Sequence, residues 1–354
     1  MDVLIIGAGP YGLATAAAAR AAGLETVVLG RPMGFWRDHM PPGMFLRSGP
    51  DWHLDARYEH TLERFLGADV PDPLPLRRFL DYADWFQTQK GLAVREERVT
   101  ALEPGFVATL ESGEQLHAPA VVATPGVAHF AYRPAWAEQV PGEHTCDLTD
   151  LSGLEGRRVA IIGGRQSAYE WAALAGEHGA ERVDVVHRHD TPRFERSDWS
   201  FVDPLVELTR TEKGWWRALP ESERETIGRR FWEVGRLALE DWLVPRLDHV
   251  RAHAGTEVVE AAPGRLVLSD GETLTPDRVV YATGYVAALE RVPYLPPVLT
   301  RNGFPVLDDA MGTSLDGLYL PGFAATQDFG PFFGFVKGAP AAAELVVRDL
   351  VARA

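Results

Sequence analysis

The chain carries the same run of features twice, and this internal repeat limits its possible folds more than any other feature. The first copy begins with the apolar residues 3–6, continues with the loop GAGPYG at residues 7–12, and enters an alanine-rich stretch that ends at Gly23. The second copy begins with the apolar residues 159–162 and continues with the loop GGRQSA at residues 163–168. A strand, a tight turn and a helix are predicted at both places.

Both copies also close in the same way. Residues 106–110 pair across a Ser-Gly turn with residues 115–116, and the Asp-Gly turn at residues 270–271 forms a second hairpin. An apolar strand then leads to Thr124 in one copy and Thr283 in the other, 117 and 120 residues after the first glycine of each loop. We therefore predict an α/β fold with two Rossmann-like, three-layer dinucleotide-binding domains.

The first glycine loop predicts binding of a dinucleotide pyrophosphate, because the start of the following helix offers free N–H groups and a partial positive charge. Gly7 permits the tight turn, Gly9 leaves room for phosphate, and Gly12 lets helix and strand pack closely. Gly30 and Arg31 stand where an acidic residue usually binds the ribose. Arg31 is expected either to face the pyrophosphate or adenine, or to lie in solvent.

The second loop differs at its middle position, where Arg165 replaces glycine. Its side chain either blocks close approach of a pyrophosphate or points away and adds a guanidinium to the site. Arg188 follows the second strand of this copy and is suited to a 2′-phosphate, unless it is only a surface charge. This copy is therefore expected to bind a nicotinamide cofactor, with NADPH favoured over NADH.

Charge and composition remove several classes of protein. A net charge of −15 repels nucleic acid, and the longest helix-like apolar stretch, residues 13–24, is too short to cross a bilayer. The single cysteine, Cys146, cannot form an intrachain disulfide, which fits a reducing cytoplasm and removes the Cys-x-x-Cys motif of a disulfide reductase. His187 and His189 lack neighbouring carboxylates or thiols, so no metal site is expected.

With these loops, the chain resembles the two-dinucleotide-binding flavoproteins, and within them the flavin-containing and N-hydroxylating (class B) monooxygenases. The resemblance spans nearly the whole chain and is carried by the two loops and by residues 34–36, 144–145 and 282–285. It implies an FAD unit formed by residues 1–152 and 285–354, with an NAD(P) unit, residues 153–284, inserted in it. Residues from about 190 to 250, rich in Trp and Arg, are predicted to form a helical lid over the NAD(P) unit; a helical pair buried against the domain and a dimer contact are the alternatives.

Site residues follow from the loops and the resemblance together. The predicted FAD contacts are Gly7, Gly9, Pro10, Tyr11, Gly12, Gly30, Arg31, Trp36, Arg47, Ser48, Val99, Thr124, Gly322, Asp328 and Phe329. The predicted NADP contacts are Gly163, Arg165, Gln166, Ser167, Arg188, Thr283 and Gly284. Arg47, Ser48 and Asp55 are expected near the flavin ring and are the catalytic candidates, although catalysis belongs mainly to the flavin.

The last segment is predicted to form a helix that begins at Pro331 or Phe332 and runs towards Val351. Asp328 is expected to cap this helix or to bind the ribityl hydroxyls, since a carboxylate satisfies the free N–H groups of a first turn. Pro340 is expected to kink the helix.

The resemblance implies a monooxygenase, in which NADPH reduces FAD and a flavin C4a-hydroperoxide oxygenates nitrogen or sulfur of a small molecule. The family's fingerprint has a glycine and a histidine four residues apart, whereas Gly142 and His144 are two apart. This spacing favours a flavin reductase or dehydrogenase without oxygen insertion, and Arg165 leaves open a flavin-binding sensor with a decayed nicotinamide site. Expected partners are a small substrate and O2, with no nucleic acid or membrane; a homodimer is left open.

Overall fold

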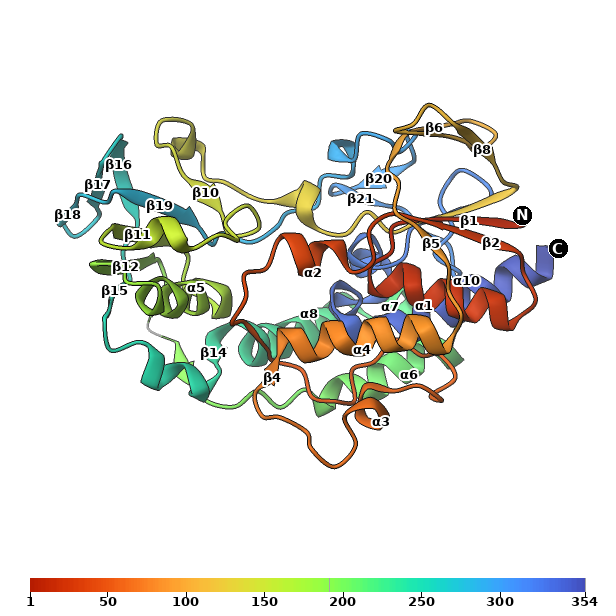
Figure 1. The fold of residues 1–354 in the computed structure, drawn as a ribbon, viewed down its shortest axis with the longest axis horizontal. Helices are drawn as coiled ribbons and strands as arrows, with labels where there is room; N and C mark the ends of the chain where they lie inside the picture. Colours follow the sequence, from red (N-terminus) through yellow and green to blue (C-terminus); the bar gives the residue numbers. More distant parts are fainter. Residues whose placement is uncertain (191, 354) are drawn as a thin grey trace.

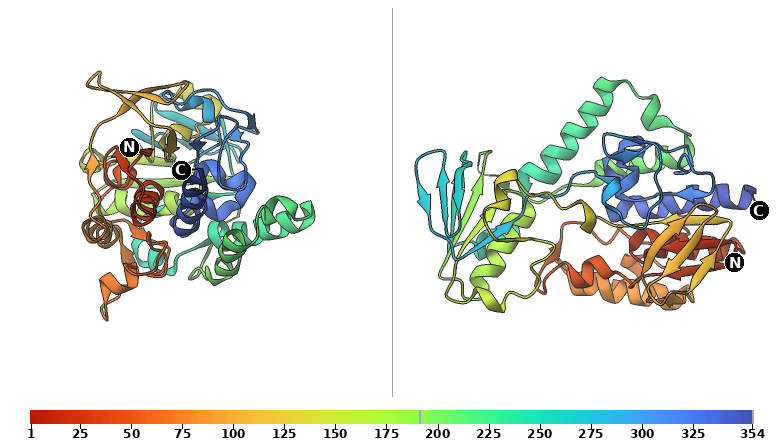
Figure 2. Two further views of the ribbon diagram at one scale, coloured as in Figure 1. Left: turned by 90° about the vertical axis from the view of Figure 1, so that its right-hand side faces the viewer. Right: turned by 90° about the horizontal axis from the view of Figure 1, so that it is seen from above.

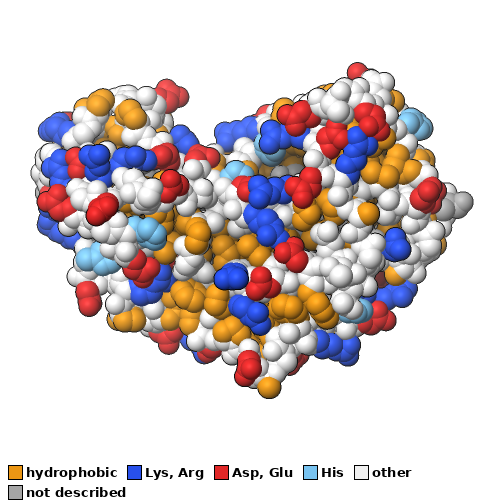
Figure 3. Space-filling model, viewed as in Figure 1, with side chains coloured by type: hydrophobic (Ala, Val, Ile, Leu, Met, Phe, Trp, Pro, Cys, Tyr) orange, Lys and Arg blue, Asp and Glu red, His pale blue; other side chains and the backbone are white. Residues whose placement is uncertain are grey.

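The structure is a computed structural model that describes residues 1–190 and 192–353; Thr191 of the predicted insertion and Ala354 lie outside the described residues. Figure 1 shows two α/β lobes side by side, with both chain termini on the same lobe. On the face drawn in Figure 3, a notch separates the two lobes along one edge. Among the described residues, no helix is long and apolar enough to span a bilayer.

The first lobe is built on a five-stranded parallel sheet whose central strand precedes the first glycine loop. Its order is β22 (Leu318–Tyr319), β9 (Ala120–Ala123), β1 (Val3–Ile6), β2 (Thr26–Leu29) and β5 (Val94–Arg95). Helices α1 (Pro10–Ala21) and α10 (Ala339–Arg353) pack against each other through fully buried alanines, Ala14, Ala339 and Ala343. Small side chains let these two helices approach closely, which explains the alanine-rich composition of both.

The second lobe repeats this sheet strand for strand. Its order is β10 (Glu143–His144), β19 (Arg278–Tyr281), β11 (Arg158–Ile162), β12 (Arg182–His187) and β15 (Val250–Ala254), all parallel. Helix α5 (Gln166–Glu177) follows the central strand, as α1 does in the first lobe. Two antiparallel sheets also match, one of β6 (Val99–Glu103), β7 (Val107–Leu110) and β8 (Gln115–His117), the other of β16 (Val258–Ala262), β17 (Arg265–Leu268) and β18 (Thr273–Leu274). The predicted pair of Rossmann-like units is confirmed.

The strands of the second sheet lie between two strands of the first sheet in the chain. The chain leaves the first sheet after β9, builds the second sheet from β10 to β19, and returns to the first sheet at β22. The second unit is therefore inserted in the first. Strand β10 begins at residue 143, so the second sheet begins nine residues before the proposed boundary at residue 152.

The segment between β12 and β15 forms helices, as predicted, and it packs on both lobes: its last helical turn, residues 241–246, contacts α5 of the second lobe. Helix α6 (Asp203–Thr211) packs against α10, and α7 (Trp215–Ala218) packs against the short helix α9 (Thr326–Phe329), both in the first lobe. Helix α8 (Glu221–Trp232) extends beside the C-terminal segment in Figure 2. Helix α6 is amphipathic and buries Val206 and Thr209 on its inner face, where Thr209 Oγ1 accepts a hydrogen bond from the indole N–H of Trp215.

The start of the last helix is also corrected. Helix α10 begins at Ala339, and residues 331–338 form short 3-10 turns instead of its first turns. Gly330, with φ +105°, ends α9 in a conformation that a continuous helix does not allow. Pro340 is the second residue of α10, where a missing N–H costs no intrahelical hydrogen bond, so it causes no kink.

Candidate functional site

The first glycine loop leaves an open space at the start of α1. A Cβ on Gly12 would lie 1.9 Å from the carbonyl oxygen of Gly7. A Cβ on Gly7, which has φ +105°, would lie 2.4 Å from the carbonyl oxygen of Thr124. Packing therefore requires glycine at both positions. A Cβ on Gly9, the N-cap residue, would meet no protein atom within 4 Å, and no side chain caps the helix. Free N–H groups facing empty space fit the pyrophosphate of FAD.

Tyr11 links this loop to the C-terminal segment. Its hydroxyl lies 2.7 Å and 2.8 Å from the carbonyl oxygens of Phe333 and Phe335, which share its single proton. Burial raises the pKa of Tyr11 well above its usual value, so the phenol keeps its proton. A Cβ on Gly322, with φ +93°, would lie 3.3 Å from the ring of Tyr11. Two of the predicted FAD residues, Tyr11 and Gly322, therefore pack on each other.

The other predicted FAD residues lie in different surroundings. Arg31 forms an exposed ion pair with Asp38 at 2.6 Å. Asp328 is buried, and its carboxylate accepts hydrogen bonds from Arg301 Nη2 at 2.8 Å and from the N–H of Leu307 at 2.9 Å. Asp328 thus ties the hairpin of β20 (Thr300–Arg301) and β21 (Phe304–Pro305) to α9 and does not cap the last helix. Among the remaining predicted FAD residues, Gly30 has φ +117° and Val99 lies at the buried start of β6. Trp36 packs on Phe79, and Phe329 packs on Phe333.

The second glycine loop repeats the first with one change. A Cβ on Gly163, with φ +132°, would lie 2.3 Å from the carbonyl oxygen of Ala282, which matches the contact of Gly7 with Thr124. Arg165 occupies the N-cap position that Gly9 holds in α1, and its guanidinium carbon lies 4.1 Å from the ring centre of Trp232. The arginine side chain therefore reaches the insertion. The N-cap residue itself is extended and makes no side-chain hydrogen bond to α5.

Of the remaining predicted NADP residues, some are hydrogen-bonded within the protein and others are exposed. Gln166 is buried, and its Oε1 accepts a hydrogen bond from the N–H of Glu240 at 3.1 Å. Thr283 donates to the carbonyl oxygen of Tyr132. Ser167 in the first turn of α5 and Arg188 after β12 are exposed, and Gly284 has φ +77°. Ser167 and Arg188 are thus open to a ligand.

Arg47 is the centre of the contact between the first lobe and the insertion. Its Nε donates to Glu240 Oε1 at 3.0 Å, and its other nitrogens donate to the carbonyl oxygens of Gly235 and Ala238 at 2.5 and 2.9 Å and to Ser197 Oγ. Arg47 thus holds the end of the insertion in place. Ser48, beside it, is half-buried.

Asp55 stabilises a turn. Its buried carboxylate accepts hydrogen bonds from the N–H groups of Arg57, Glu59 and His60, and lies 2.9 Å from Lys90 Nζ. Burial alone would raise its pKa, but the Lys90 ammonium and the backbone donors lower it, so the carboxylate stays ionised. Carboxylate and ring atoms of Asp55, Glu59 and His60 lie within 4.8 Å of one another. The Lys90 ammonium already supplies positive charge there.

Sequence reasoning missed two buried glutamates that join the lobes. Glu170 of α5 accepts a hydrogen bond from the N–H of Phe45 at 2.7 Å, and burial raises its pKa to about 7. Glu240 binds Arg47 and, through its N–H, Gln166. One signal was available for Glu170: it is the one acidic residue between Gln166 and Gly176, in an apolar helix.

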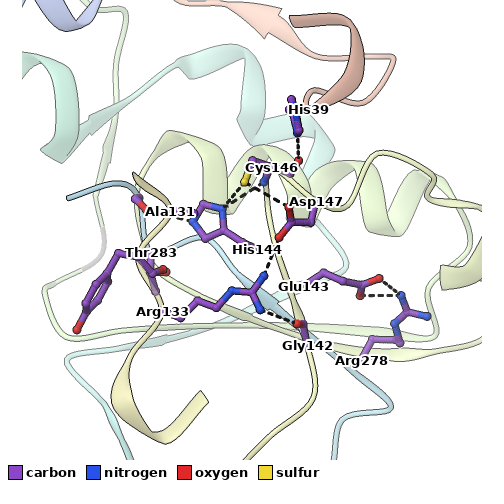
Figure 4. A network of polar contacts seen from close by, with 12 residues as sticks. His39, Ala131, Arg133, Gly142, Glu143, His144, Cys146, Asp147, Arg278 and Thr283 are labelled. Atoms are coloured by element: carbon purple, nitrogen blue, oxygen red, sulfur yellow. Dashed lines mark hydrogen bonds and ion pairs between the residues drawn. The ribbon is translucent and has the colours of Figure 1, made fainter. Parts of the chain in front are cut away.

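The segments that connect the lobes meet around His144, as Figure 4 shows. Its Nδ1 lies 3.1 Å from Cys146 Sγ, and its Nε2 lies 3.1 Å from the carbonyl oxygen of Gly284. His39 Nδ1, from the first lobe, lies 2.6 Å from the carbonyl oxygen of Cys146. Burial, with the nearby Asp147 carboxylate, raises the pKa of Cys146 to about 11, so the sulfur is a protonated thiol at neutral pH. This cluster fastens the two segments that connect the sheets.

Two like units, each with a glycine loop at the end of its central strand, define a two-dinucleotide-binding flavoprotein. The chain belongs to the pyridine nucleotide-disulphide oxidoreductase family, whose model matches residues 1–213. It is an FAD-dependent oxidoreductase, and its cofactors are FAD and NAD(P)H.

Curated relatives include reductases and a hydroxylase. The ferredoxin–NADP reductase of Salinispora arenicola is 27% identical over 333 residues, which cover 91% of this chain and 85% of the relative. That of Salinispora tropica is 29% identical over 230 residues, 60% of this chain and 65% of the relative. The FAD-dependent urate hydroxylase of Xanthomonas campestris is 27% identical over 229 residues, 54% of this chain and 46% of the relative. The chain therefore spans less than two thirds of two of these three relatives.

Solved structures share the whole fold. The ornithine N-hydroxylase of Kutzneria sp. 744 superposes with a TM-score of 0.82 at 17% identity, covering 99% of both chains. The ornithine hydroxylase of Pseudomonas aeruginosa superposes with a TM-score of 0.78 at 20% identity, covering 99% of this chain and 98% of that one. At this identity the likeness establishes the fold alone.

Proposed function

We propose that this protein is an NAD(P)H-dependent flavin monooxygenase that oxygenates a nitrogen or sulfur atom of a small molecule. The observation that carries the proposal is the closure of the insertion over the loop that contains Arg47 and Ser48. Trp199 of the insertion packs edge-on against Trp52 at 5.7 Å between ring centres, and it also contacts Phe335 at 6.0 Å. An aromatic cover of this kind excludes water, and oxygenation requires a dry site to compete with release of hydrogen peroxide.

Each cofactor has candidate binding residues in this proposal. Bound FAD would supply acceptance of a hydride from NAD(P)H and transfer of the electrons to O2. Gly9 and the free N–H groups of α1 hold its pyrophosphate, and Tyr11 keeps the C-terminal segment against that loop. Arg188, which is exposed after β12, is the candidate for binding a 2′-phosphate, and Arg165 lies at the start of α5.

Disulfide reduction within the chain is not part of the proposal. Cys146 is the single cysteine, and it is buried and protonated. A dithiol that cycles with an intramolecular disulfide needs two such residues.

The second candidate is an NAD(P)H-dependent reductase that passes electrons onward without inserting oxygen. Two observations favour it. The curated relatives from Salinispora are named ferredoxin–NADP reductases, and one of them aligns over 91% of this chain. Gly142 and His144 also keep the short spacing that departs from the monooxygenase fingerprint.

Turnover in isotopically labelled O2 tests the proposal. The FAD-loaded protein is supplied with NADPH and a panel of small amines and thioethers, and three products are measured: NADP+, hydrogen peroxide and labelled organic product. A monooxygenase converts part of the NADPH consumed into labelled product with at least one panel member. NADPH oxidation that yields only hydrogen peroxide with every member, together with rapid reduction of an added ferredoxin, would establish the second candidate instead.

A further inference from the structure

A hollow of about 510 Å3 lies between the insertion and the C-terminal segment. Its walls come from α7, α8, the turn after β20 and α9, and neither glycine loop contributes a lining residue. The side chains that give it chemical character are Trp216, Arg224, Arg301, Asn302, Phe304 and Gln327. The hollow therefore includes neither glycine loop, although Arg301 in its wall pairs with Asp328, one of the predicted FAD contacts.

The side chains that line the hollow carry positive charge, although the protein as a whole is strongly negative. Arg224 and Arg301 line the hollow, and none of the described residues in its walls is acidic, whereas the whole chain carries a net charge of −15. Arg301 pairs with the buried Asp328 at 2.8 Å. Arg224 is half-buried, donates to the carbonyl oxygen of Arg217 at 3.3 Å, and has no carboxylate partner among the residues that the structure describes. A half-buried guanidinium without a counter-charge favours an anionic ligand.

Two rings give the hollow flat apolar walls. Trp216 is buried, and its indole N–H donates to the carbonyl oxygen of Gln327 at 3.1 Å, which fixes the ring. Phe304 packs against Phe323 with 5.7 Å between ring centres. Fixed aromatic walls stack on flat rings better than on saturated ones.

Amide groups lie beside these rings. The side-chain amides of Asn302 and Gln327 lie 3.2 Å apart at the rim. Together they offer a donor and an acceptor to polar atoms at the edge of a ring.

We propose that this hollow binds a small, flat aromatic or heteroaromatic anion, with Arg224 as its charge partner and with Trp216 and Phe304 as its stacking walls. The site goes beyond the proposed oxidoreductase chemistry, because ligand binding there does not depend on whether oxygen is inserted. Lys90, Lys337 and the basic residues near the glycine loops contribute nothing to it, since none of them lines the hollow.

Calorimetric titration of the FAD-loaded protein with benzoate tests the proposal without turnover. Benzoate is expected to bind one site, whereas benzamide, which has the ring without the charge, and cyclohexanecarboxylate, which has the charge without the flat ring, bind at least about tenfold more weakly. Saturating NADP+ leaves benzoate binding unchanged, because the hollow shares no residue with the second glycine loop.

Two variants assign the binding to this hollow. Arg224→Gln is expected to weaken benzoate binding about tenfold or more, while Arg229→Gln, an equal charge change at an exposed position of the same helix outside the hollow, leaves it unchanged. Phe304→Leu removes a wall without changing charge and weakens benzoate more than cyclohexanecarboxylate. The proposal would be overturned if benzoate did not bind, or if it bound equally well to the Arg224→Gln variant. It would also be overturned if the two carboxylates bound equally well, or if NADP+ abolished benzoate binding.

Discussion

Arg47 Nε donates a hydrogen bond of 3.0 Å to Glu240 Oε1, and this contact joins residues 193 positions apart in the chain. The two side chains are 16% and 5% exposed. A buried ion pair of this kind fixes geometry, because removing one partner leaves the other charge without solvent or counter-charge. The position of the insertion over the first lobe therefore depends on this pair.

Glu240→Ala should lower the free energy of unfolding by about 3–5 kcal/mol, because Arg47 would stay buried without its counter-charge. The change is measured by urea denaturation. Arg31→Ala is the matched control, because it breaks an ion pair whose side chains are 55% and 38% exposed. That substitution should cost less than about 1 kcal/mol. Similar losses in the two variants would contradict a structural role for the buried pair.

Gly9→Ala and Gly12→Ala should separate cofactor binding from folding. Alanine at position 9 meets no protein atom and has an ordinary backbone conformation, so the apoprotein keeps its stability while the added methyl occupies the space expected for the pyrophosphate. FAD retention should fall sharply. Alanine at position 12 would clash with the Gly7 carbonyl and destabilise the apoprotein by about 1–3 kcal/mol or more. Full FAD content in a folded Gly9→Ala protein would contradict the assignment of the loop.

Arg165→Ala decides between the two roles considered for this side chain. If the guanidinium helps to bind NADPH, its removal should raise the KM for NADPH about tenfold, because one charge-assisted hydrogen bond is lost. The FAD content should stay unchanged. Steady-state kinetics of flavin reduction measures this. A lower KM in Arg165→Ala would show that the arginine obstructs the site, which would support a decayed nicotinamide site.

Glu170 should make stability depend on pH. Burial raises its folded pKa from 4.5 to about 7, so the folded state favours the protonated acid. The stabilising contribution is therefore complete below about pH 4.5 and is lost as pH rises towards 7, to a limit of roughly 3 kcal/mol. Glu170→Gln cannot ionise. Relative to that variant, the protein should lose stability between pH 5 and pH 8 in urea denaturation; a constant difference would contradict the raised pKa of this buried carboxyl.

The sequence predicts local elements well because short-range patterns determine them. Strand β1 has the bounds of the predicted apolar run 3–6, β11 is one residue longer than the predicted run 159–162, and glycines with positive φ, Gly23 and Gly179, follow the end of the first helix of each unit. These features depend on alternation, turn chemistry and backbone conformation within a few residues.

Features that depend on distant contacts could not be predicted in this way. Arg47 was expected beside the flavin, but no local pattern indicates Glu240 as its partner. The last helix begins at Ala339 because buried Phe332 and Phe333 hold the preceding turns in the core, which outweighs the helix-start signal at Pro331. The insertion packs on the first lobe through α6 and α7, which composition alone does not indicate.

Anaerobic titration of the FAD-loaded protein with NADPH tests the central claim, that two dinucleotide-binding units in one chain pass a hydride from a nicotinamide to a flavin. The visible flavin absorbance should bleach fully at about one equivalent of NADPH and return when air is admitted. A purified, folded protein that takes up no FAD, or bound FAD whose spectrum NADPH and NADH leave unchanged, would contradict it.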